Sequence, residues 1–63
     1  MIIKYRRYDA LENVNVLHVI TNVDHIQAHV KYLSFWLIGQ PKFIFRLNLT
    51  EINDVRIENE TKS

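Results

Sequence analysis

The segment from Lys31 to Ile52 (KYLSFWLIGQPKFIFRLNLTEI) contains most of the aromatic residues of the chain and limits its fold more than any other stretch. Its β-branched and aromatic residues favour extended backbone over helix. The only glycine and the only proline of the chain, Gly39 and Pro41, stand near its middle, and both residue types are typical of turns. The segment therefore predicts two strands joined as a β-hairpin.

The two faces of this hairpin differ, because side chains in a strand point alternately to opposite sides. The odd-numbered positions are apolar in both strands and predict the core: Leu33, Phe35, Leu37, Phe43, Phe45, Leu47 and Leu49. Two strand registers keep this face together. With Gln40-Pro41-Lys42 as the loop, Phe35 lies opposite Leu47. A longer loop places Phe35 opposite Phe45.

The even-numbered face has the composition of an interface. Four apolar side chains and one arginine form it: Tyr32, Trp36, Ile38, Ile44 and Arg46. Aromatic residues and arginine are enriched at the centres of protein interfaces, where they contribute most of the binding energy. We predict that another molecule covers this face. The alternative is that the segment Met1–Tyr8 folds across it as a second layer.

Apolar alternation predicts three further strands, over Met1–Tyr8, Val14–Thr21 and Val55–Glu58. Asp9–Asn13 joins the first two strands as a turn. Thr50 can cap a helix, so Thr50–Asp54 predicts a one-turn helix before the last strand.

Residues 22–30 fit two structures. Val23, Ile26 and Val30 follow helical spacing, whereas Ile26 and Ala28 alternate with polar neighbours as a strand requires. The β-branched and aromatic run that follows favours a strand. A short helix over 22–30, which would make the protein α+β, stays open.

The predicted fold is a small all-β domain over residues 1–58, followed by a polar tail over 59–63 that we expect to fray. Alanine, a strong helix former, occurs only twice, as Ala10 and Ala28. About five strands would form a twisted sheet or a partly open barrel of SH3-like or Sm-like architecture.

The small size of the chain predicts self-association. A domain of this length buries only about 60% of the surface that its unfolded chain exposes. The sequence has no cysteine for disulfides and no Cys/His cluster for a structural zinc ion, so a partner chain is the remaining means of stabilisation. The start of the chain has no long apolar run, which predicts a cytoplasmic location, or a virion, without a membrane partner.

Residues for catalysis are scarce. The chain has no glycine-rich phosphate loop, and its only serines are Ser34 and Ser63. We therefore predict no enzymatic activity and no cofactor. His25 and His29 lie four residues apart, as metal ligands can, and Asp24 or His18 could join them. Without a fixed third ligand, we predict no metal site.

Two functions remain. The first is an interaction or assembly protein that binds itself and possibly a larger protein, such as an accessory or structural factor of a phage or mobile element. The second is a small barrel that binds single-stranded nucleic acid through a basic and aromatic run: Lys4, Tyr5, Arg6, Arg7 and Tyr8. The net charge of +1 is low for a nucleic-acid-binding protein, so we favour the first function.

Overall fold

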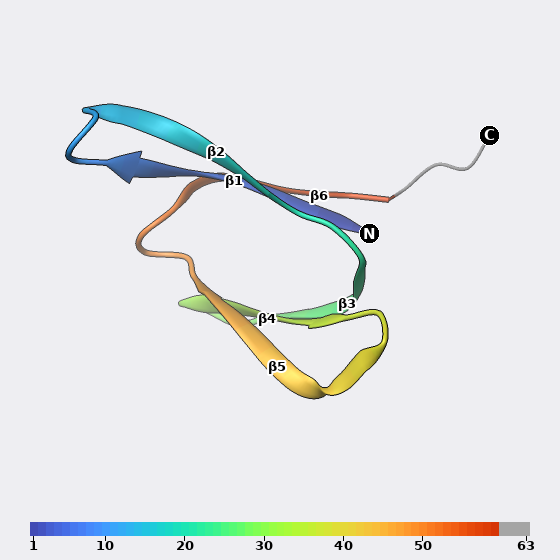
Figure 1. Ribbon diagram of the computed structural model, residues 1–63. Coiled ribbons are helices and arrows are strands. Elements are labelled where there is room, and N and C mark those ends of the chain that lie inside the picture. The colour runs from blue at the N-terminus through green and yellow to red at the C-terminus, as the bar shows by residue number, and fades with distance from the viewer. Residues whose placement is uncertain (60–63) are drawn as a thin grey trace.

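The computed structural model describes residues 1–59 and shows an all-β protein (Figure 1). Its six strands are β1 (Ile2–Asp9), β2 (Val14–Ile20), β3 (Val23–Ala28), β4 (Tyr32–Leu37), β5 (Gln40–Asn48) and β6 (Asn53–Glu58). They form two antiparallel three-stranded sheets, in the orders β2–β1–β6 and β3–β4–β5.

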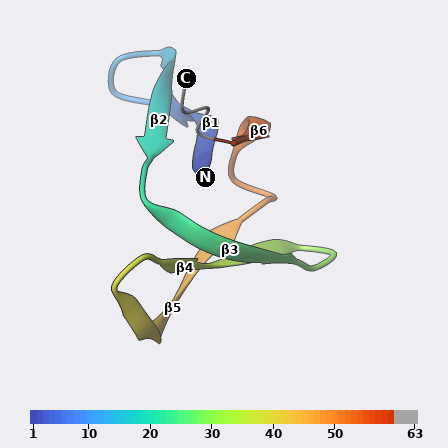
Figure 2. The ribbon, with the colours of Figure 1, turned by 90° about the vertical axis from the view of Figure 1, so that its right-hand side faces the viewer.

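The two sheets face each other across a small core, which Figures 1 and 2 show as an upper and a lower layer. Four apolar side chains are buried between them: Ile3 of β1, Val23 of β3, and Leu33 and Phe35 of β4. Half-buried side chains from both sheets surround these four, among them Tyr5 and Phe45. The core is small even for a chain of this length, so little apolar burial stabilises the fold.

Asn22 marks the corner where the chain leaves one sheet and enters the other. It has a φ of 59°, a left-handed conformation that asparagine tolerates better than most residues. The backbone nitrogen of Met1 donates to the Val23 carbonyl over 2.7 Å, and the Val23 nitrogen donates to the Met1 carbonyl over 3.0 Å. These bonds join the first sheet to the start of β3, as expected where a bent strand changes sheets.

Most of the predicted strands are confirmed. The first two strands and their turn, which the sequence predicted over Met1–Tyr8, Val14–Thr21 and Asp9–Asn13, differ from the structure by a residue at some ends. The strand interpretation of residues 22–30 is also confirmed, because β3 occupies most of that segment. The short helix considered there is wrong.

The turn of the predicted hairpin lies elsewhere. Gln40-Pro41-Lys42, predicted as the loop, forms the start of β5, and the turn consists of Ile38 and Gly39. Phe35 pairs with Phe45, but a bulge after Phe35 shifts the register so that Leu37 pairs with Gln40. Gly39, the second residue of this turn, has a φ of 84°, which glycine adopts at no steric cost.

Phe43 was predicted in the core, and this prediction is wrong, because its side chain is 62% exposed. Figures 1 and 2 show that the end of the hairpin beside the β4–β5 turn points away from the other sheet. Leu33 and Phe35 lie where the two sheets overlap and are buried as predicted. Phe43 lies instead in the bulged part of β5, between Gln40 and Phe45, where no residue of β4 pairs with it.

A turn over residues 49–51 replaces the one-turn helix predicted over Thr50–Asp54. The Asn48 side-chain oxygen accepts hydrogen bonds from the Thr50 nitrogen, over 3.1 Å, and from the Thr50 hydroxyl, over 2.7 Å. An asparagine that bonds the backbone two residues further on favours a turn over a helix. The predicted barrel is likewise not confirmed, since the strands of residues 1–59 are assigned to two sheets.

The tail predicted over residues 59–63 lies, apart from Asn59, outside the described residues. Within the described part of the chain, no helix is long and apolar enough to cross a membrane.

Candidate interaction surface

The side of the β3–β4–β5 sheet that faces away from the core carries the candidate surface. We call it the outer face and define it by eight side chains: His25, Gln27, His29, Tyr32, Ser34, Trp36, Arg46 and Asn48. The register aligns them in rows across the sheet, since Gln27 pairs with Ser34 and Ser34 with Arg46. Residues paired in this way share a face. The outer face therefore combines residues from all three strands.

Two stacks of side chains cover the outer face. The His25 ring lies on the Trp36 ring, with centroids 4.2 Å apart and planes 12° from parallel. The His29 ring lies in the same way on Tyr32, at 4.3 Å and 22°. The Arg46 guanidinium carbon stands 4.8 Å from the centroid of the Tyr32 ring. Such contacts between cross-strand neighbours restrict the rotamers of all the side chains involved.

The centre of the outer face is dense. Ser34 lies in the row between the two stacks and is only 4% exposed. The face thus presents an ordered surface of stacked rings.

The first strand does not cover the outer face. Ile3 of β1 packs instead with Leu33 and Phe35 on the opposite side of the β3–β4–β5 sheet. The alternative that Met1–Tyr8 folds across the even-numbered face is therefore wrong. Within residues 1–59, both sheets contribute to the core from their inner sides only.

Three of the five predicted interface residues come together on the outer face: Tyr32, Trp36 and Arg46. Ile44 lies in the part of β5 that has no paired residue on β4 and is 59% exposed. Ile38 lies in the β4–β5 turn, where it is exposed and its backbone nitrogen donates to the Asn22 carbonyl over 2.8 Å. The sequence analysis missed the three residues that the β3 side contributes. Their alternation with Ile26 and Ala28 was the available signal, and the helix alternative concealed it.

The predicted nucleic-acid residues lie on β1, but the cations among them face carboxylates. Ion pairs join Lys4 to Glu58 at 3.2 Å, Arg6 to Asp54 at 3.7 Å, and Arg7 to Glu51 at 3.7 Å. Cations near the start of the chain thus meet carboxylates of β6 and of the segment before it. The positive charge of this run is therefore largely balanced within the protein.

The two tyrosines of this run point to different places. Tyr5 stacks on His18 of β2, with ring centroids 5.0 Å apart, and packs against the core. Tyr8 is exposed, and its hydroxyl donates to the Asn13 side chain across the β1–β2 turn. The run of residues 4–8 is divided between the two sides of its sheet, with Lys4, Arg6 and Tyr8 on one side and Tyr5 and Arg7 on the other.

A shallow pocket of about 510 Å³ lies at one end of the outer face, lined by Lys31, Tyr32, Arg46, Asn48 and Thr50. It contains two cations and no carboxylate. A second pocket, of about 230 Å³, lies on the other sheet, where Asp54 and Glu58 accompany three cations. Only the first of these two pockets thus has cations without any carboxylate.

A metal site is not assembled in the described part of the chain, where no group of three His, Cys, Asp or Glu side chains converges. His25 contacts the Asp24 carboxylate at 2.8 Å and stacks on Trp36. His18 lies in the other sheet, beside Tyr5.

No family model, curated protein or solved structure matches this chain.

Proposed function

We propose that this protein is a non-enzymatic interaction protein that self-associates through the outer face of its β3–β4–β5 sheet. The observation that carries the proposal is the stacked arrangement of Trp36 and Tyr32 on a face that no segment of residues 1–59 covers. Side chains already held in place lose little conformational entropy when a partner binds. The outer face is therefore suited to a stable protein contact.

The small core supports the same conclusion. Only four apolar side chains of residues 1–59 are buried, whereas many large apolar side chains on both sheets stay exposed. Association of two copies would remove part of this surface from water, at a gain of about 25 cal/mol per Å². A larger protein could also use the face, as an accessory or structural factor of a phage or mobile element would require.

The fluorescence of Trp36 tests this proposal directly, because it is the only tryptophan of the chain and stands on the outer face. We expect blue-shifted emission at micromolar concentration and a red shift when the sample is diluted. Circular dichroism on the same samples separates dissociation from unfolding. Emission that does not depend on concentration would contradict self-association through this face.

Single-stranded nucleic acid is the second candidate ligand, at a different place from the run over residues 4–8. Lys31 and Arg46 flank Tyr32 in a pocket without carboxylates, and an aromatic ring between cations can bind a base and its phosphates. However, His29 and Arg46 already contact the Tyr32 ring, so a base would have to displace one of them.

An oligonucleotide titration separates the two candidates. Binding to phosphates weakens steeply as salt rises, because each neutralised phosphate releases counterions. Burial of apolar rings against protein holds or strengthens as salt rises. Salt-sensitive quenching of Trp36 by a single-stranded oligonucleotide would favour the nucleic-acid function. No quenching, together with an assembly that persists in high salt, would favour the protein contact.

A further inference from the structure

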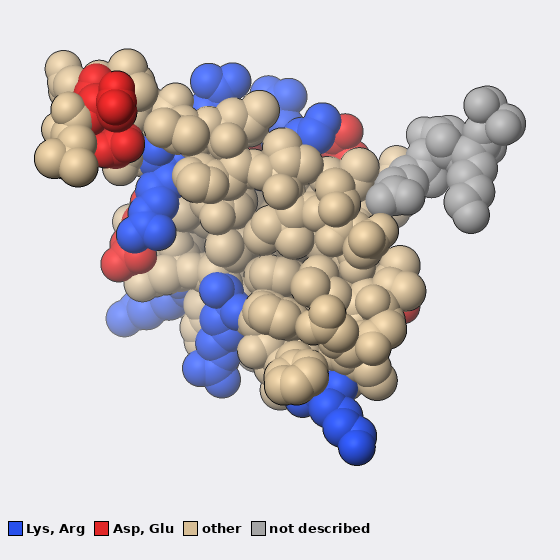
Figure 3. Space-filling view, viewed as in Figure 1, with Lys and Arg blue, Asp and Glu red and all other residues tan. Residues whose placement is uncertain are grey.

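The β1–β2 turn presents an acidic and apolar tip. Leu11 is 97% exposed, and Glu12 beside it is exposed and has no ion-pair partner among residues 1–59. Figure 3 shows acidic atoms gathered at this turn, at the upper left of the molecule. A leucine at this exposure, next to a carboxylate, is a candidate contact for a surface that is both basic and aromatic.

Hydrogen bonds hold this tip in one shape. The Asp9 carboxylate accepts from the backbone nitrogens of Leu11, over 3.0 Å, and Glu12, over 3.4 Å. The Asn13 nitrogen donates to the Asp9 carbonyl over 2.7 Å, and Asn13 has the left-handed φ of 56° that closes the turn. Asp9 is thus occupied within the turn, and Glu12 is the carboxylate that a partner can reach.

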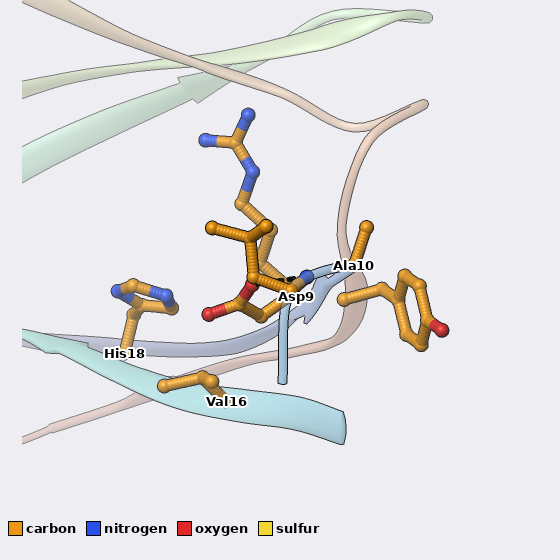
Figure 4. A pocket seen from close by; sticks show the side chains of 7 residues that line it. Asp9, Ala10, Val16 and His18 are labelled. Atoms are coloured by element: carbon orange, nitrogen blue, oxygen red, sulfur yellow. Dashed lines mark hydrogen bonds between the residues drawn. The ribbon is translucent and has the colours of Figure 1, made fainter. Parts of the chain in front are cut away.

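Open space lies beside the part of the hairpin that is next to the tip. A pocket of about 440 Å³ lies there, and Figure 4 shows Asp9, Ala10, Val16 and His18 around it. The tip therefore stands out from the fold with open space on its inner side.

The matching basic surface is the pocket at the end of the outer face. Neither Lys31 nor Arg46 has a carboxylate within ion-pair distance among the described residues. The Asn48 oxygen is turned toward Thr50 by two hydrogen bonds, so the amide NH₂ group points the other way as a pure donor. Two cations and a donor beside the Tyr32 ring suit a carboxylate with an apolar neighbour.

We propose that the β1–β2 turn of one copy docks on the outer face of a second copy, with Glu12 between Lys31 and Arg46 and Leu11 beside Tyr32. This inference rests on the proposed function and names the partner of the outer face. Charge complementarity supports it, because residues 23–48 carry Lys31, Lys42 and Arg46 against Asp24 alone, whereas the turn carries only acids. Two outer faces pressed together would instead bring like charges near one another.

Charge reversal tests this contact, and both positions are exposed, so the variants should fold. Glu12→Lys and Lys31→Glu should each weaken association about three- to tenfold at low salt, because a like-charged pair replaces an ion pair at the rim of an interface. The double variant, Glu12→Lys with Lys31→Glu, should restore association by forming the pair with opposite signs. An equimolar mixture of the single variants should associate better than either variant alone.

Lys42→Glu is the matched control. It makes the same change of charge on the same sheet, outside the pocket, and should leave association unchanged. If the protein associates but the double variant is as weak as the single variants, the docking of the turn is wrong and the proposed function stands. If the wild-type protein is a monomer at all concentrations, both are wrong.

Discussion

The two sheets of this protein use their charged residues in opposite ways. In the β2–β1–β6 sheet, the cations of β1 pair with carboxylates of β6 and of the segment before it, as in the contact of Lys4 with Glu58. In the β3–β4–β5 sheet, Arg46 lies over Tyr32 and Lys31 beside it, without a carboxylate partner among residues 1–59. The first sheet balances its own charge, and the second leaves cations available next to stacked rings.

This difference shows why the charge of the whole chain is a poor guide to its surface. The net charge of +1 hides one nearly neutral sheet and one basic sheet. The cluster of cations that is densest in the sequence, over residues 4–7, is the one that the fold neutralises. Lys31 and Arg46, which have no ion pair in the described chain, lie far apart in the sequence and meet in the pocket at the end of the outer face.

The largest expected effect is the loss of stability when a buried phenylalanine of the hairpin is truncated, compared with an exposed one. Phe35→Ala should cost about 3 to 5 kcal/mol of unfolding free energy, since Phe35 is 5% exposed in a core of few residues. Such a loss would leave little folded protein at 37 °C. Urea denaturation followed by circular dichroism measures it.

Phe43→Ala is the control for that experiment, because it removes the same side chain from the same strand pair. Phe43 is largely exposed, so the change in stability should stay within about 0.5 kcal/mol. If the two variants unfold at the same urea concentration, the inner face of the sheet is assigned wrongly.

The next effect compares the outer sides of the two sheets. Trp36→Ala should weaken association by at least about 2 kcal/mol, as expected for an aromatic residue at the centre of an interface. Leu17→Ala, on the outer side of the other sheet, should have little effect although Leu17 is also exposed. Sedimentation velocity at several concentrations compares the two. Equal losses would show that the outer face is not the preferred contact.

The smallest effect concerns the ion pairs of β1. Arg6→Ala combined with Arg7→Ala should change stability by less than about 1 kcal/mol per pair, because both arginines and their carboxylate partners are exposed. Association should also be nearly unchanged. If the wild-type protein instead binds oligonucleotides in a salt-sensitive way and this double variant does not bind them, the basic run of β1 binds nucleic acid.

The alternation of side chains along a strand explains which parts of the hairpin the sequence could predict. The core side of β4 followed from the alternation of Leu33 and Phe35 with their neighbours, and the opposite side followed as the candidate surface. The position of the turn did not, because the bulge after Phe35 shifts the register and no residue pattern marks it. The exposure of Phe43 depends on the same bulge and on how far the other sheet extends, and neither can be predicted from the residues around Phe43.

The candidate surface was predicted in part for a related reason. Tyr32, Trp36 and Arg46 belong to one hairpin, so their shared face was visible in its alternation. His25 and His29 join them through a different strand pair, which becomes visible only once residues 22–30 are assigned to a strand. The pairing of β1 with β6 was not predicted, although the two ends of the chain carry opposite charges that meet in it.

Light scattering across a dilution series tests the central claim most directly, when combined with melting temperatures on the same samples. We expect an assembly larger than one chain at micromolar concentration, and a melting temperature that rises with concentration, because a partner that binds only the folded chain stabilises it. Trp36→Ala should move both quantities toward those of a monomer. A monodisperse wild-type monomer with a concentration-independent melting temperature would contradict the account.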